Sequence, residues 1–480
     1  MLIDSTAATS SARRRLTAGL AASALLVGLA PAAVAMARED APHGAAGIGD
    51  SYYPHDGNGG IDVSHYDVHD RYDFARGRLS GWTDVTLTAT QTLSGFNLDL
   101  LLPVQKVSVD GAEVPFEKAG GGHELVIDAA VTAGQEYVVR VRYAGRPGEL
   151  RYNGEANWLA DRREVVTMNQ PHMAPWWFPA NDHPRDKAAL DIHVTVPKGK
   201  QVVANGERVG RTVRDGLATT HWRATEPMAP YLAFFAAGSF VVDRGTDAAG
   251  RPWVVAVSER ADNRARMLRM MKRHDDVVAW LEEHVGDYPF STTGGVYTVL
   301  PAGFALENQT RPTYSQWADL PTVIHEAAHQ WFGDDVAVEN WRDIWLNEGF
   351  ATFFEKYWTE THGGETADGW LRSAYRSTPA DAGFWRQHIA DPGAGMHELF
   401  SGAVYYRGAM TVQALRNRVG EDDFWTIVRT WVAEQGGGNG SSEEFETLAE
   451  QVSGEDLDGF FTAWLRTGER PARTAANGLD

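Results

Sequence analysis

A short stretch in the second half of the chain carries residue types that could bind a metal ion. In the segment VIHEAAHQWFGDD, His325 and His329 stand four residues apart, and Glu326 directly follows the first histidine. On an α-helix, residues at this spacing share one face, about 6 Å apart along the axis, so both imidazoles could point at one ion. Glu326, about 100° further round the helix, would lie beside that ion as a base for a metal-bound water. Taken alone, the pattern equally fits an amphipathic helix with two surface histidines.

A third metal ligand follows after a gap of 18 residues. Glu348 lies in the segment WLNEGFATFFE, at the start of an apolar helical face that would aim its carboxylate inward. A buried carboxylate without a partner is costly, so an inward glutamate implies a cation. The chain has no cysteine, and a catalytic zinc needs three protein ligands and one open position. We therefore predict one Zn²⁺ held by His325, His329 and Glu348, with Asn347 and Thr352 as hydrogen-bonding neighbours of the ligands.

The order of these residues resembles a known family. HEAAHQWFGD followed by WLNEGFA is similar to the M1 metallopeptidases, the aminopeptidase N and leukotriene A4 hydrolase group of the gluzincin clan. The resemblance extends from about residue 60 to 470. It implies a multi-domain α+β fold, in which an N-terminal all-β domain precedes an α-rich, thermolysin-like zinc peptidase domain. It also implies a short form of the family that lacks the large helical C-terminal domain of its longer members.

Upstream, the segment GFALENQTRPTY (303–314) resembles the family's exopeptidase loop, usually written G-x-M-E-N. By this resemblance Glu307 binds the free amino terminus of a peptide, with Asn308 beside it. The chemistry agrees, because an aminopeptidase needs a carboxylate near the metal to recognise an ammonium group. Phe304 stands where the family has Gly, and Leu306 where it has Met. A bulky Phe304 would narrow the cleft or push the loop outward, which leaves the substrate preference open.

Downstream, the segment VYYRGAM (404–410) resembles the family's Y-x-K-G segment, with Arg407 in the Lys position and Gly408 kept. A tyrosine hydroxyl is neutral at pH 7 and donates a hydrogen bond, so it can stabilise an oxyanion opposite the metal. A pair of aromatic residues is otherwise typical of a core. The register with Arg407 and Gly408 favours Tyr405 over Tyr406 as the catalytic residue.

The segment TMNQPHMAPWWFPANDHPRDKA (167–188) resembles another family segment, which ends in an aromatic-Pro pair and a D-x-P turn. Counted back from its FP pair, Gln170 falls where the family has Gln or Glu as a second anchor for the substrate amine. A neutral Gln there would offer its carbonyl oxygen. The alternative is a buried Gln in a turn. We expect the nearby His172 and His183 to be structural.

The first 37 residues differ from the rest of the chain. Three arginines (13–15) precede a run of apolar and small residues (16–34) that ends in AVAMA. These are the parts of a secretory signal peptide, and Gly, Ser and Pro31 dilute the run below what a membrane anchor needs. We predict cleavage after Ala35 or Ala37 and a secreted protein without a stable membrane span. The arginine run leaves the twin-arginine route open.

The charge of the chain narrows its partners. The 480 residues carry a net charge of −20, and removing residues 1–37 makes it −22, because three arginines and one aspartate are lost. Nucleic-acid binding needs a basic surface, so we exclude nucleic acid as a partner. The length suggests two or three domains, and we expect a monomer.

The periodicity of apolar residues divides the chain. Alternation predicts strands at 84–90, 106–111, 136–143 and 190–197. Helical spacing predicts a helix from Asp262 or Asn263 to Gly286 and, after a strand at 295–300, helices at 321–333, 344–360, about 402–419, 423–435 and 442–452. The predicted organisation is a signal peptide (1–37), a flexible lead-in (38–60), a β domain (61–245), a zinc peptidase domain (246–470) and a tail (471–480).

These residues together predict an exported zinc aminopeptidase that acts on peptides with a free N-terminus, with Glu326 as the base and Tyr405 as the oxyanion donor. One alternative is a thermolysin-type zinc endopeptidase, in which the Phe304 loop does not enforce cleavage at the first residue. A second is a non-catalytic, zinc-containing binding protein, although a structural zinc is usually closed by four protein ligands. An epoxide hydrolase side activity is known in one branch of the family, but nothing in this sequence indicates a lipid-binding pocket.

Overall fold

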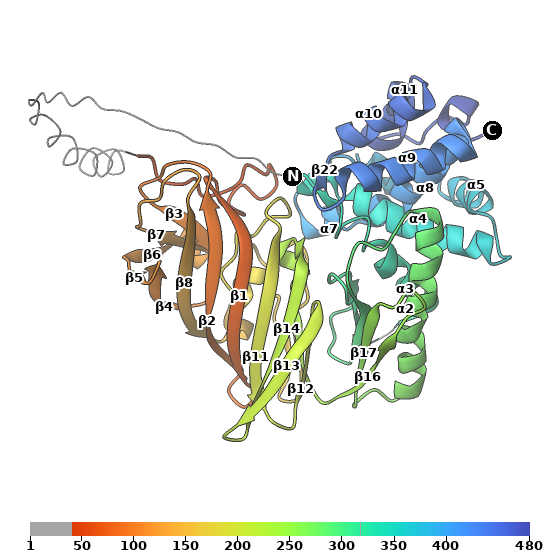
Figure 1. Cartoon of the computed structure of the whole chain (residues 1–480). Helices are drawn as coiled ribbons and strands as arrows, with labels where there is room; N and C mark the ends of the chain where they lie inside the picture. Colours follow the sequence, from red (N-terminus) through yellow and green to blue (C-terminus); the bar gives the residue numbers. More distant parts are fainter. Residues whose placement is uncertain (1–40, 317) are drawn as a thin grey trace, which may run out of the picture.

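The computed structural model describes residues 41–316 and 318–480, so the predicted signal peptide and residues 38–40 of the predicted lead-in lie outside it. Figure 1 shows two parts side by side, a sheet-rich part coloured red to yellow-green and a helix-rich part coloured green to blue. This arrangement confirms the predicted α+β fold with an N-terminal β domain. Within the described residues, no helix is both long and apolar enough to cross a bilayer.

The N-terminal domain is built on one eight-stranded sheet. Its strands are β1 (Ile61–Asp73), β2 (Arg78–Ala89), β4 (Val104–Val109), β5 (Ala112–Glu113), β8 (Glu136–Gly145), β11 (Ala188–Pro197), β13 (Glu207–Arg214) and β14 (Leu217–Met228). Their order is β13-β14-β11-β1-β2-β8-β4-β5. Along β11, buried residues alternate with partly exposed ones, because successive side chains point to opposite faces of a sheet. One face of the sheet therefore packs on the core and the other meets solvent.

Two smaller sheets complete this domain. The four-stranded sheet contains β12 (Gln201–Ala204), β15 (Phe235–Gly238), β10 (Val165–Val166) and β9 (Leu159–Ala160), in that order. The three-stranded sheet contains β3 (Phe96–Asp99), β7 (Glu124–Ile127) and β6 (Phe116–Ala119). Trp176, Trp177 and Trp222 are fully buried in the core. Burial of these large rings supplies much of the hydrophobic stabilisation of the domain.

The second domain begins with a five-stranded sheet of β16 (Phe240–Thr246), β17 (Pro252–Ser258), β18 (Thr293–Thr298), β20 (Thr313–Ser315) and β19 (Ala305–Leu306). Helix α2 (Arg264–His284) connects β17 to the parallel strand β18. β16 pairs with β17 along its whole length. The predicted boundary at residue 245 therefore falls inside a strand of the second domain.

The helices follow this sheet and fill the right-hand part of Figure 1. They are α3 (Leu320–Ala328), α4 (Trp345–Thr361), α5 (Ala367–Ser377), α6 (Gly383–Arg386), α7 (Met396–Leu399), α8 (Gly402–Val419), α9 (Glu421–Gln435), α10 (Ser442–Ser453) and α11 (Asp458–Phe461). Helix α3 ends five residues before the predicted 333, whereas α4, α8 and α10 agree with the prediction within a residue. The predicted helices did not include α5, α6, α7 and α11. Two short strands, β21 (Ala337–Val338) and β22 (Asn439–Gly440), pair in parallel.

Two terminal segments are packed, contrary to the prediction of a flexible lead-in and a tail. In the first, the Asp50 carboxylate accepts hydrogen bonds from the backbone N–H of Trp341 (2.9 Å) and from His183 Nε2 (3.1 Å). In the second, Leu479 is buried, and Tyr375 donates to the carbonyl oxygen of Pro471 at 2.7 Å. The Gly- and Asp-rich composition indicates irregular backbone, but its polar groups bond to distant elements and hold it in place.

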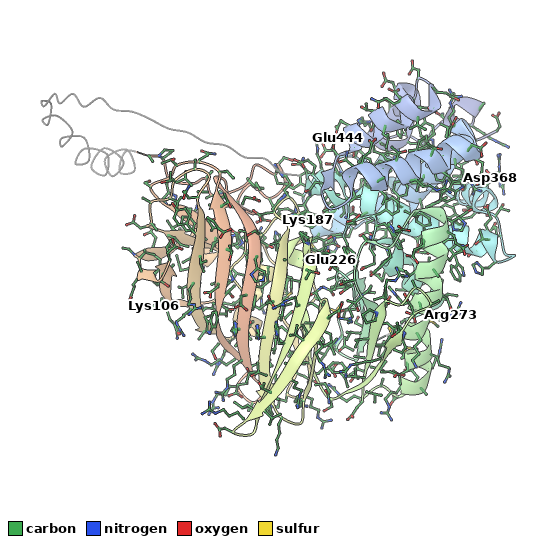
Figure 2. The ribbon with its side chains drawn as sticks, viewed as in Figure 1. Lys106, Lys187, Glu226, Arg273, Asp368 and Glu444 are labelled. Atoms are coloured by element: carbon green, nitrogen blue, oxygen red, sulfur yellow. The ribbon has the colours of Figure 1, made fainter. Side chains whose placement is uncertain are left out.

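The two domains are joined by buried cations. Lys187, labelled in Figure 2, comes from the β domain and donates to the carbonyl oxygens of Asp334 (2.9 Å) and Asp335 (2.6 Å). From the other side, the fully buried Arg311 donates to the carbonyl oxygens of Ala204 (2.6 Å) and Gly206 (2.9 Å). Arg311 belongs to the segment 303–314, so these bonds fix that segment against the β domain.

Candidate active site

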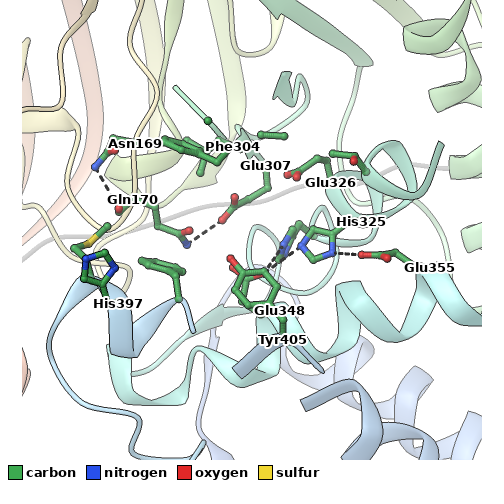
Figure 3. A pocket seen from close by; sticks show the side chains of 17 residues that line it. Asn169, Gln170, Phe304, Glu307, His325, Glu326, Glu348, Glu355, His397 and Tyr405 are labelled. Atoms are coloured by element: carbon green, nitrogen blue, oxygen red, sulfur yellow. Dashed lines mark hydrogen bonds and ion pairs between the residues drawn. The ribbon is translucent and has the colours of Figure 1, made fainter. Parts of the chain in front are cut away.

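Three side chains from two neighbouring helices meet at one point. Helix α3 supplies His325, His329 caps its C-terminal end, and Glu348 comes from the first turn of α4. Glu348 Oε2 lies 3.1 Å from His325 Nε2 and 3.4 Å from His329 Nε2. Figure 3 shows His325 and Glu348 facing each other across this point. The structure thus brings the three predicted metal ligands together.

The other nitrogen of each imidazole is held from behind. His325 Nδ1 donates to Glu355 Oε1 at 2.9 Å, and His329 Nδ1 donates to the carbonyl oxygen of Phe332 at 3.0 Å. Neutral imidazoles held in this way turn their Nε2 lone pairs toward Glu348. The three ligand atoms lie within 4.8 Å of one another, and two imidazoles with one carboxylate are a known donor set of catalytic zinc. The residues present therefore fit a zinc ion.

The charges of the ligands also favour a cation. Burial opposes ionisation of Glu348, but His329 and His325 outweigh it and lower its pKa to about 2. Burial likewise opposes protonation of His329, yet Glu348 and Glu307 raise its pKa to about 9. The cluster thus keeps an ionised carboxylate that requires positive charge beside it, whether from protons or from a metal ion.

Glu355 was not predicted from the sequence. It makes the hydrogen bond to a metal ligand that was expected from Asn347 or Thr352. Asn347 Nδ2 and Thr352 Oγ1 have no hydrogen-bond partner among the described residues, so these two groups do not hold the ligands. Glu355 follows Glu348 by seven residues on α4, which is two helical turns and the same face. That spacing could have identified Glu355 from the sequence. Thr352, four residues after Glu348, lies near the same face but its Oγ1 makes no hydrogen bond among the described residues, and Asn347 lies about 100° further round the helix.

Glu326 lies on α3 beside the metal ligands, as Figure 3 shows. Its side chain is buried, and Oε2 has no hydrogen-bond partner within residues 41–316 and 318–480. Burial raises the pKa of Glu326 to about 8, although His325 and His329 act to lower it. A carboxyl group with a pKa near neutrality can both take up and release a proton. Its position and pKa suit an acid–base role.

A second carboxylate, Glu307, lies close to Glu326 and His329, with ligand atoms of the three within 4.8 Å of one another. Glu307 Oε1 accepts hydrogen bonds from Gln170 Nε2 at 3.0 Å and from the Tyr231 hydroxyl at 3.1 Å. Gln170 comes from the β domain, and Tyr231 from the short 3-10 helix Pro230–Leu232. Tyr231 was not identified from the sequence, because nothing in its neighbourhood marks it. Both donors hold the carboxylate in one orientation, facing the metal ligands.

Asn308, predicted to lie beside Glu307 at the substrate, is turned away from the cavity. Its Nδ2 donates to the carbonyl oxygen of Leu232 at 3.0 Å, and it is not among the residues that line the cavity. The same bond ties the Glu307 loop to the 3-10 helix that carries Tyr231. Asn308 therefore holds the Glu307 loop in position and does not itself line the cavity.

Tyr405 lies on α8 and completes the wall around the metal ligands. Its ring stacks nearly parallel to that of His325, with centroids 5.8 Å apart. Burial, followed by Glu348 and other carboxylates, raises the pKa of Tyr405 well above its usual value, so the hydroxyl is a neutral donor. A Cβ at Gly408 would come 2.8 Å from Gly349 Cα, so two glycines allow α8 to approach α4 closely.

The positions of Tyr406 and Arg407 agree with the placement of Tyr405 at the cavity. Tyr406 is 50% exposed and lies outside the cavity. Arg407, in the position of the family's Lys, is fully buried. Its two Nη atoms donate to four backbone carbonyl oxygens, those of Trp385, Gln387, Ala463 and Thr467. Arg407 thus fixes α8 against the C-terminal helices.

The predicted metal ligands His325, His329 and Glu348 line one cavity of about 700 Å³. Its polar lining includes Gln170, Glu307, Glu326 and Tyr405. Phe304 also lines it and is 36% exposed, so this residue stands at the edge of the cavity and narrows its entrance without closing it. A volume of this size accommodates several residues of a peptide.

His172 and His183 lie outside this cavity and have buried carboxylate partners. His172 contacts Asp56 through Nε2 and Glu155 Oε1 through Nδ1 at 2.9 Å, and His183 Nε2 contacts Asp50 Oδ2 at 3.1 Å. These partners belong largely to the segment 41–60. The two histidines therefore help to attach that segment to the β domain.

Two histidines and a glutamate around one point, with a further glutamate beside them on the same helix, form the site of a zinc peptidase. Two family models match this chain, the peptidase M1 N-terminal domain over residues 63–232 and the peptidase family M1 domain over residues 293–464. The chain therefore belongs to the M1 peptidase family, whose cofactor is zinc.

Relatives of known name agree with this assignment. A leucyl aminopeptidase from Saccharolobus solfataricus is 23% identical over 451 residues, which cover 87% of this chain and 55% of the relative. Aminopeptidase M1-B from Oryza sativa subsp. japonica is 24% identical over 441 residues, which cover 84% and 49%. The chain thus spans about half the length of the curated relatives it matches.

Solved structures match over a larger share of their length. A variant of an M1 zinc metallopeptidase from Deinococcus radiodurans, bound to the substrate Tyr-Ser-Ala, has a TM-score of 0.77 at 26% identity and covers 89% of this chain and 100% of that chain. A variant of a two-domain M1 zinc metallopeptidase, bound to L-tryptophan, has a TM-score of 0.76 at 25% identity and covers 89% and 99%. The two domains described here therefore have a full-length structural counterpart.

Proposed function

We propose that the protein is a zinc aminopeptidase that removes residues from the free N-terminus of peptides. The observation that carries this proposal is the pairing of Glu307 with Gln170 and Tyr231 beside Glu326 and the predicted metal ligands. A carboxylate fixed at this place binds an ammonium group, and it sets how far a peptide can enter the cavity. Relatives named aminopeptidases support the same assignment.

Each residue has a distinct task in this reaction. His325, His329 and Glu348 would hold the zinc ion, which supplies a Lewis acid and an acidified water when bound. Glu326 takes up the proton of the attacking water at its unpaired Oε2 and later delivers it to the leaving amine. The Tyr405 hydroxyl donates a hydrogen bond to the oxygen that becomes negatively charged during attack on the scissile carbonyl.

The amine end of the substrate is held by the groups around Glu307. Its carboxylate accepts hydrogen bonds from the substrate ammonium, while the Tyr231 hydroxyl and Gln170 Nε2 keep it oriented. The Gln170 amide oxygen remains to accept a further hydrogen bond from the same ammonium. Because both anchors lie at the inner wall, only the first residue of a peptide fits between them and the metal ligands.

A pair of matched peptides tests the proposal. The purified protein is given one short peptide with a free and with an acetylated amino terminus, each with and without a chelator. We expect chelator-sensitive release of the first residue from the free form alone. Cleavage of both forms would make the protein an endopeptidase, with Phe304 at an open cavity edge. Cleavage of neither form would contradict the proposal and favour a zinc-containing binding protein.

We also propose that the protein is exported. Support comes from the arginine run, the short apolar run and the AVAMA site of residues 1–37. The N-terminal sequence of protein recovered from the culture medium or the cell envelope is the measurement. A first residue near 36 or 38 is expected, and recovery of the uncleaved chain from the cytosol alone would contradict export.

A further inference from the structure

The outer face of the eight-stranded sheet carries a second group of histidines and carboxylates. The group consists of Asp67 and His69 on β1, Asp191 and His193 on β11, and His221 on β14, and is called the histidine–aspartate ladder below. The strand register places His69 opposite His193 and His193 opposite His221, while Asp67 lies opposite Asp191. Residues opposite each other across strands share a face and touch. The ladder is therefore a row of three imidazoles beside a row of two carboxylates.

Stacking holds the imidazoles in one orientation. His69 stacks on Trp82 with centroids 3.8 Å apart, on His193 at 4.0 Å, and His193 stacks on His221 at 3.9 Å. The interplanar angles of the three pairs are 12°, 7° and 15°. Parallel rings 4.0 Å apart cannot both direct a nitrogen lone pair at one ion, so binding of an ion requires His69 or His193 to turn out of the stack.

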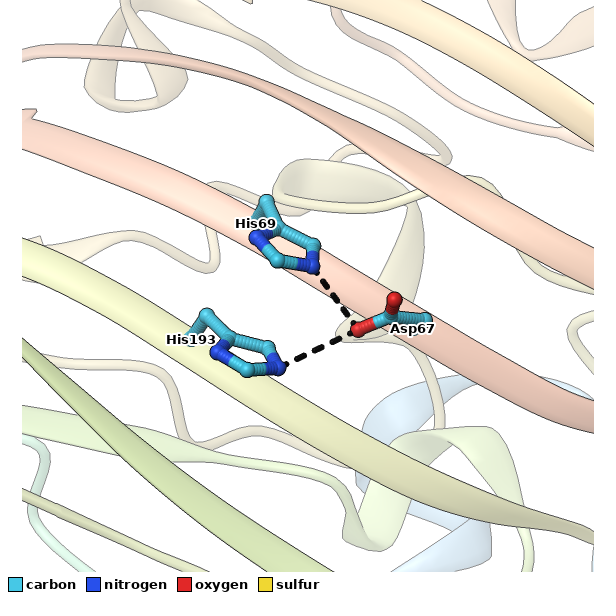
Figure 4. A group of neighbouring side chains, drawn as sticks. All are labelled: Asp67, His69 and His193. Atoms are coloured by element: carbon cyan, nitrogen blue, oxygen red, sulfur yellow. Dashed lines mark ion pairs between the residues drawn. The ribbon is translucent and has the colours of Figure 1, made fainter. Parts of the chain in front are cut away.

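The Nε2 atoms of His69 and His193 both lie near one carboxylate oxygen of Asp67. Asp67 Oδ1 lies 2.9 Å from His69 Nε2 and 3.3 Å from His193 Nε2, as Figure 4 shows. Ligands of a tetrahedral zinc ion, at about 2.0–2.2 Å from the metal, are about 3.3 Å from one another. The three side chains are 21% to 31% exposed, so an ion can reach them from solvent and keep water in its fourth position.

We propose that Asp67, His69 and His193 bind one divalent transition-metal ion, with Zn²⁺ as the probe of choice, at a site separate from the catalytic cluster. Imidazole donors favour zinc, copper or nickel over magnesium or calcium, which prefer oxygen. One ion between the two nitrogens and Asp67 satisfies all three groups with a single positive centre.

A competing set of ligands on the same face is weaker. Asp191, His193 and His221 also offer three ligand atoms within 4.8 Å. However, Asp191 Oδ1 already lies 2.8 Å from Arg223 Nε, and its Oδ2 lies 3.1 Å from His65 Nε2. Those contacts occupy both oxygens of the Asp191 carboxylate, and the positive charge of Arg223 repels a second cation. Because His193 belongs to both sets, the ladder holds one ion and not two.

The histidines themselves provide the test and its matched control. The full chain is stripped of metal with a chelator and titrated with Zn²⁺, and bound ions per chain are counted by calorimetry and by metal analysis. We expect two ions for the wild type and one for His193→Ala or His69→Ala. His221→Ala removes a neighbouring imidazole of the same row and should keep two ions, with an affinity within about 3-fold of wild type.

Three outcomes would overturn the assignment. If His193→Ala binds as many ions as the wild type, the ladder holds no metal. Loss of the second ion in His221→Ala but not in His69→Ala would move the site to the competing set. Should the alanine variants misfold, as shown by circular dichroism, Asp67→Asn supplies the same comparison with the shape retained, and an unchanged ion count there would also contradict the proposal. Peptide hydrolysis serves as a separate reading of the catalytic cluster and should be the same in all four variants.

Discussion

The catalytic cluster and the histidine–aspartate ladder offer similar donors in different settings. Each brings two imidazoles and a carboxylate within 4.8 Å. In the catalytic cluster Glu348 is 2% exposed, whereas in the ladder the Asp67 side chain is 31% exposed. A buried cation site interacts more strongly with neighbouring charges, because less water screens them. The ladder can bind an ion beside a smaller hollow of about 460 Å³ that His69 and His193 line, whereas the cluster opens into the cavity of about 700 Å³.

What distinguishes the cluster is the set of residues around the ligands. It has Glu326 as the proposed base, Tyr405 as the proposed oxyanion donor, Glu355 bound to His325 Nδ1, and Glu307 as the proposed substrate anchor. Among the described residues that line the hollow beside His69 and His193, Asp70 is the one carboxylate. Metal ligands alone therefore do not make this site a peptidase. The predictions below remove the surrounding residues one at a time and so make the cluster more like the ladder.

Removal of the base is expected to have the largest effect. In Glu326→Gln the side chain keeps its shape and loses the ability to take up a proton. We expect zinc content to be unchanged and kcat to fall by about 10²–10⁴, the usual contribution of general acid–base catalysis. Steady-state kinetics and metal analysis of the same preparation measure both quantities. A variant with near-normal kcat would remove Glu326 from the mechanism.

Loss of the Tyr405 hydroxyl is expected to rank second. Tyr405→Phe keeps the ring stacked on His325 and deletes only the donor, so kcat should fall by about 10²–10³ with little change in KM. Tyr406→Phe is the matched control, because Tyr406 is adjacent and 50% exposed. If the control loses as much activity as the test variant, the assignment of the oxyanion donor is wrong.

Weakening the support behind a ligand should have a moderate effect on metal binding. In Glu355→Gln the His325 Nδ1–H loses a charged acceptor, and we expect zinc affinity to fall by about 10–100-fold. Glu360→Gln on the same helix is the control, since Glu360 pairs with Arg416 and not with a ligand. Competition with a chromogenic chelator measures the affinity. Equal affinities in the two variants would show that Glu355 does not orient His325.

The sequence predicted the cluster better than the ladder for a physical reason. His325, His329 and Glu348 lie on helices, where a spacing of three or four residues already implies a shared face. The ladder depends on the pairing of β1 with β11 and of β11 with β14, and strand register cannot be obtained from the residues of one strand. Local spacing reveals helical sites, whereas sites across a sheet need the fold.

The same distinction explains the other differences between prediction and structure. Glu307, Tyr405 and Gln170 were found through a family resemblance, and the structure places all three at the cavity. Tyr231 was missed because its role arises only from contact with Glu307. The segment 41–60 was predicted as flexible from composition, although its carboxylates bond to His172 and His183. Residues whose partners are distant in the chain carry no local signal of their role.

The smallest expected effect concerns the hydroxyl behind the substrate anchor. Tyr231 donates to Glu307 at 3.1 Å, so Tyr231→Phe leaves the carboxylate in place with Gln170 as its remaining donor. The lost bond has a net value of about 0.5–1.5 kcal/mol, which corresponds to a decrease of about 2–10-fold in kcat/KM for peptides with a free amino terminus. Tyr406→Phe supplies the control, because Tyr406 is exposed and lies outside the cavity. Since the ligands, Glu326 and Tyr405 are untouched, zinc content should not change. A fall in zinc content instead would show that Tyr231 supports the metal ligands and not the amine.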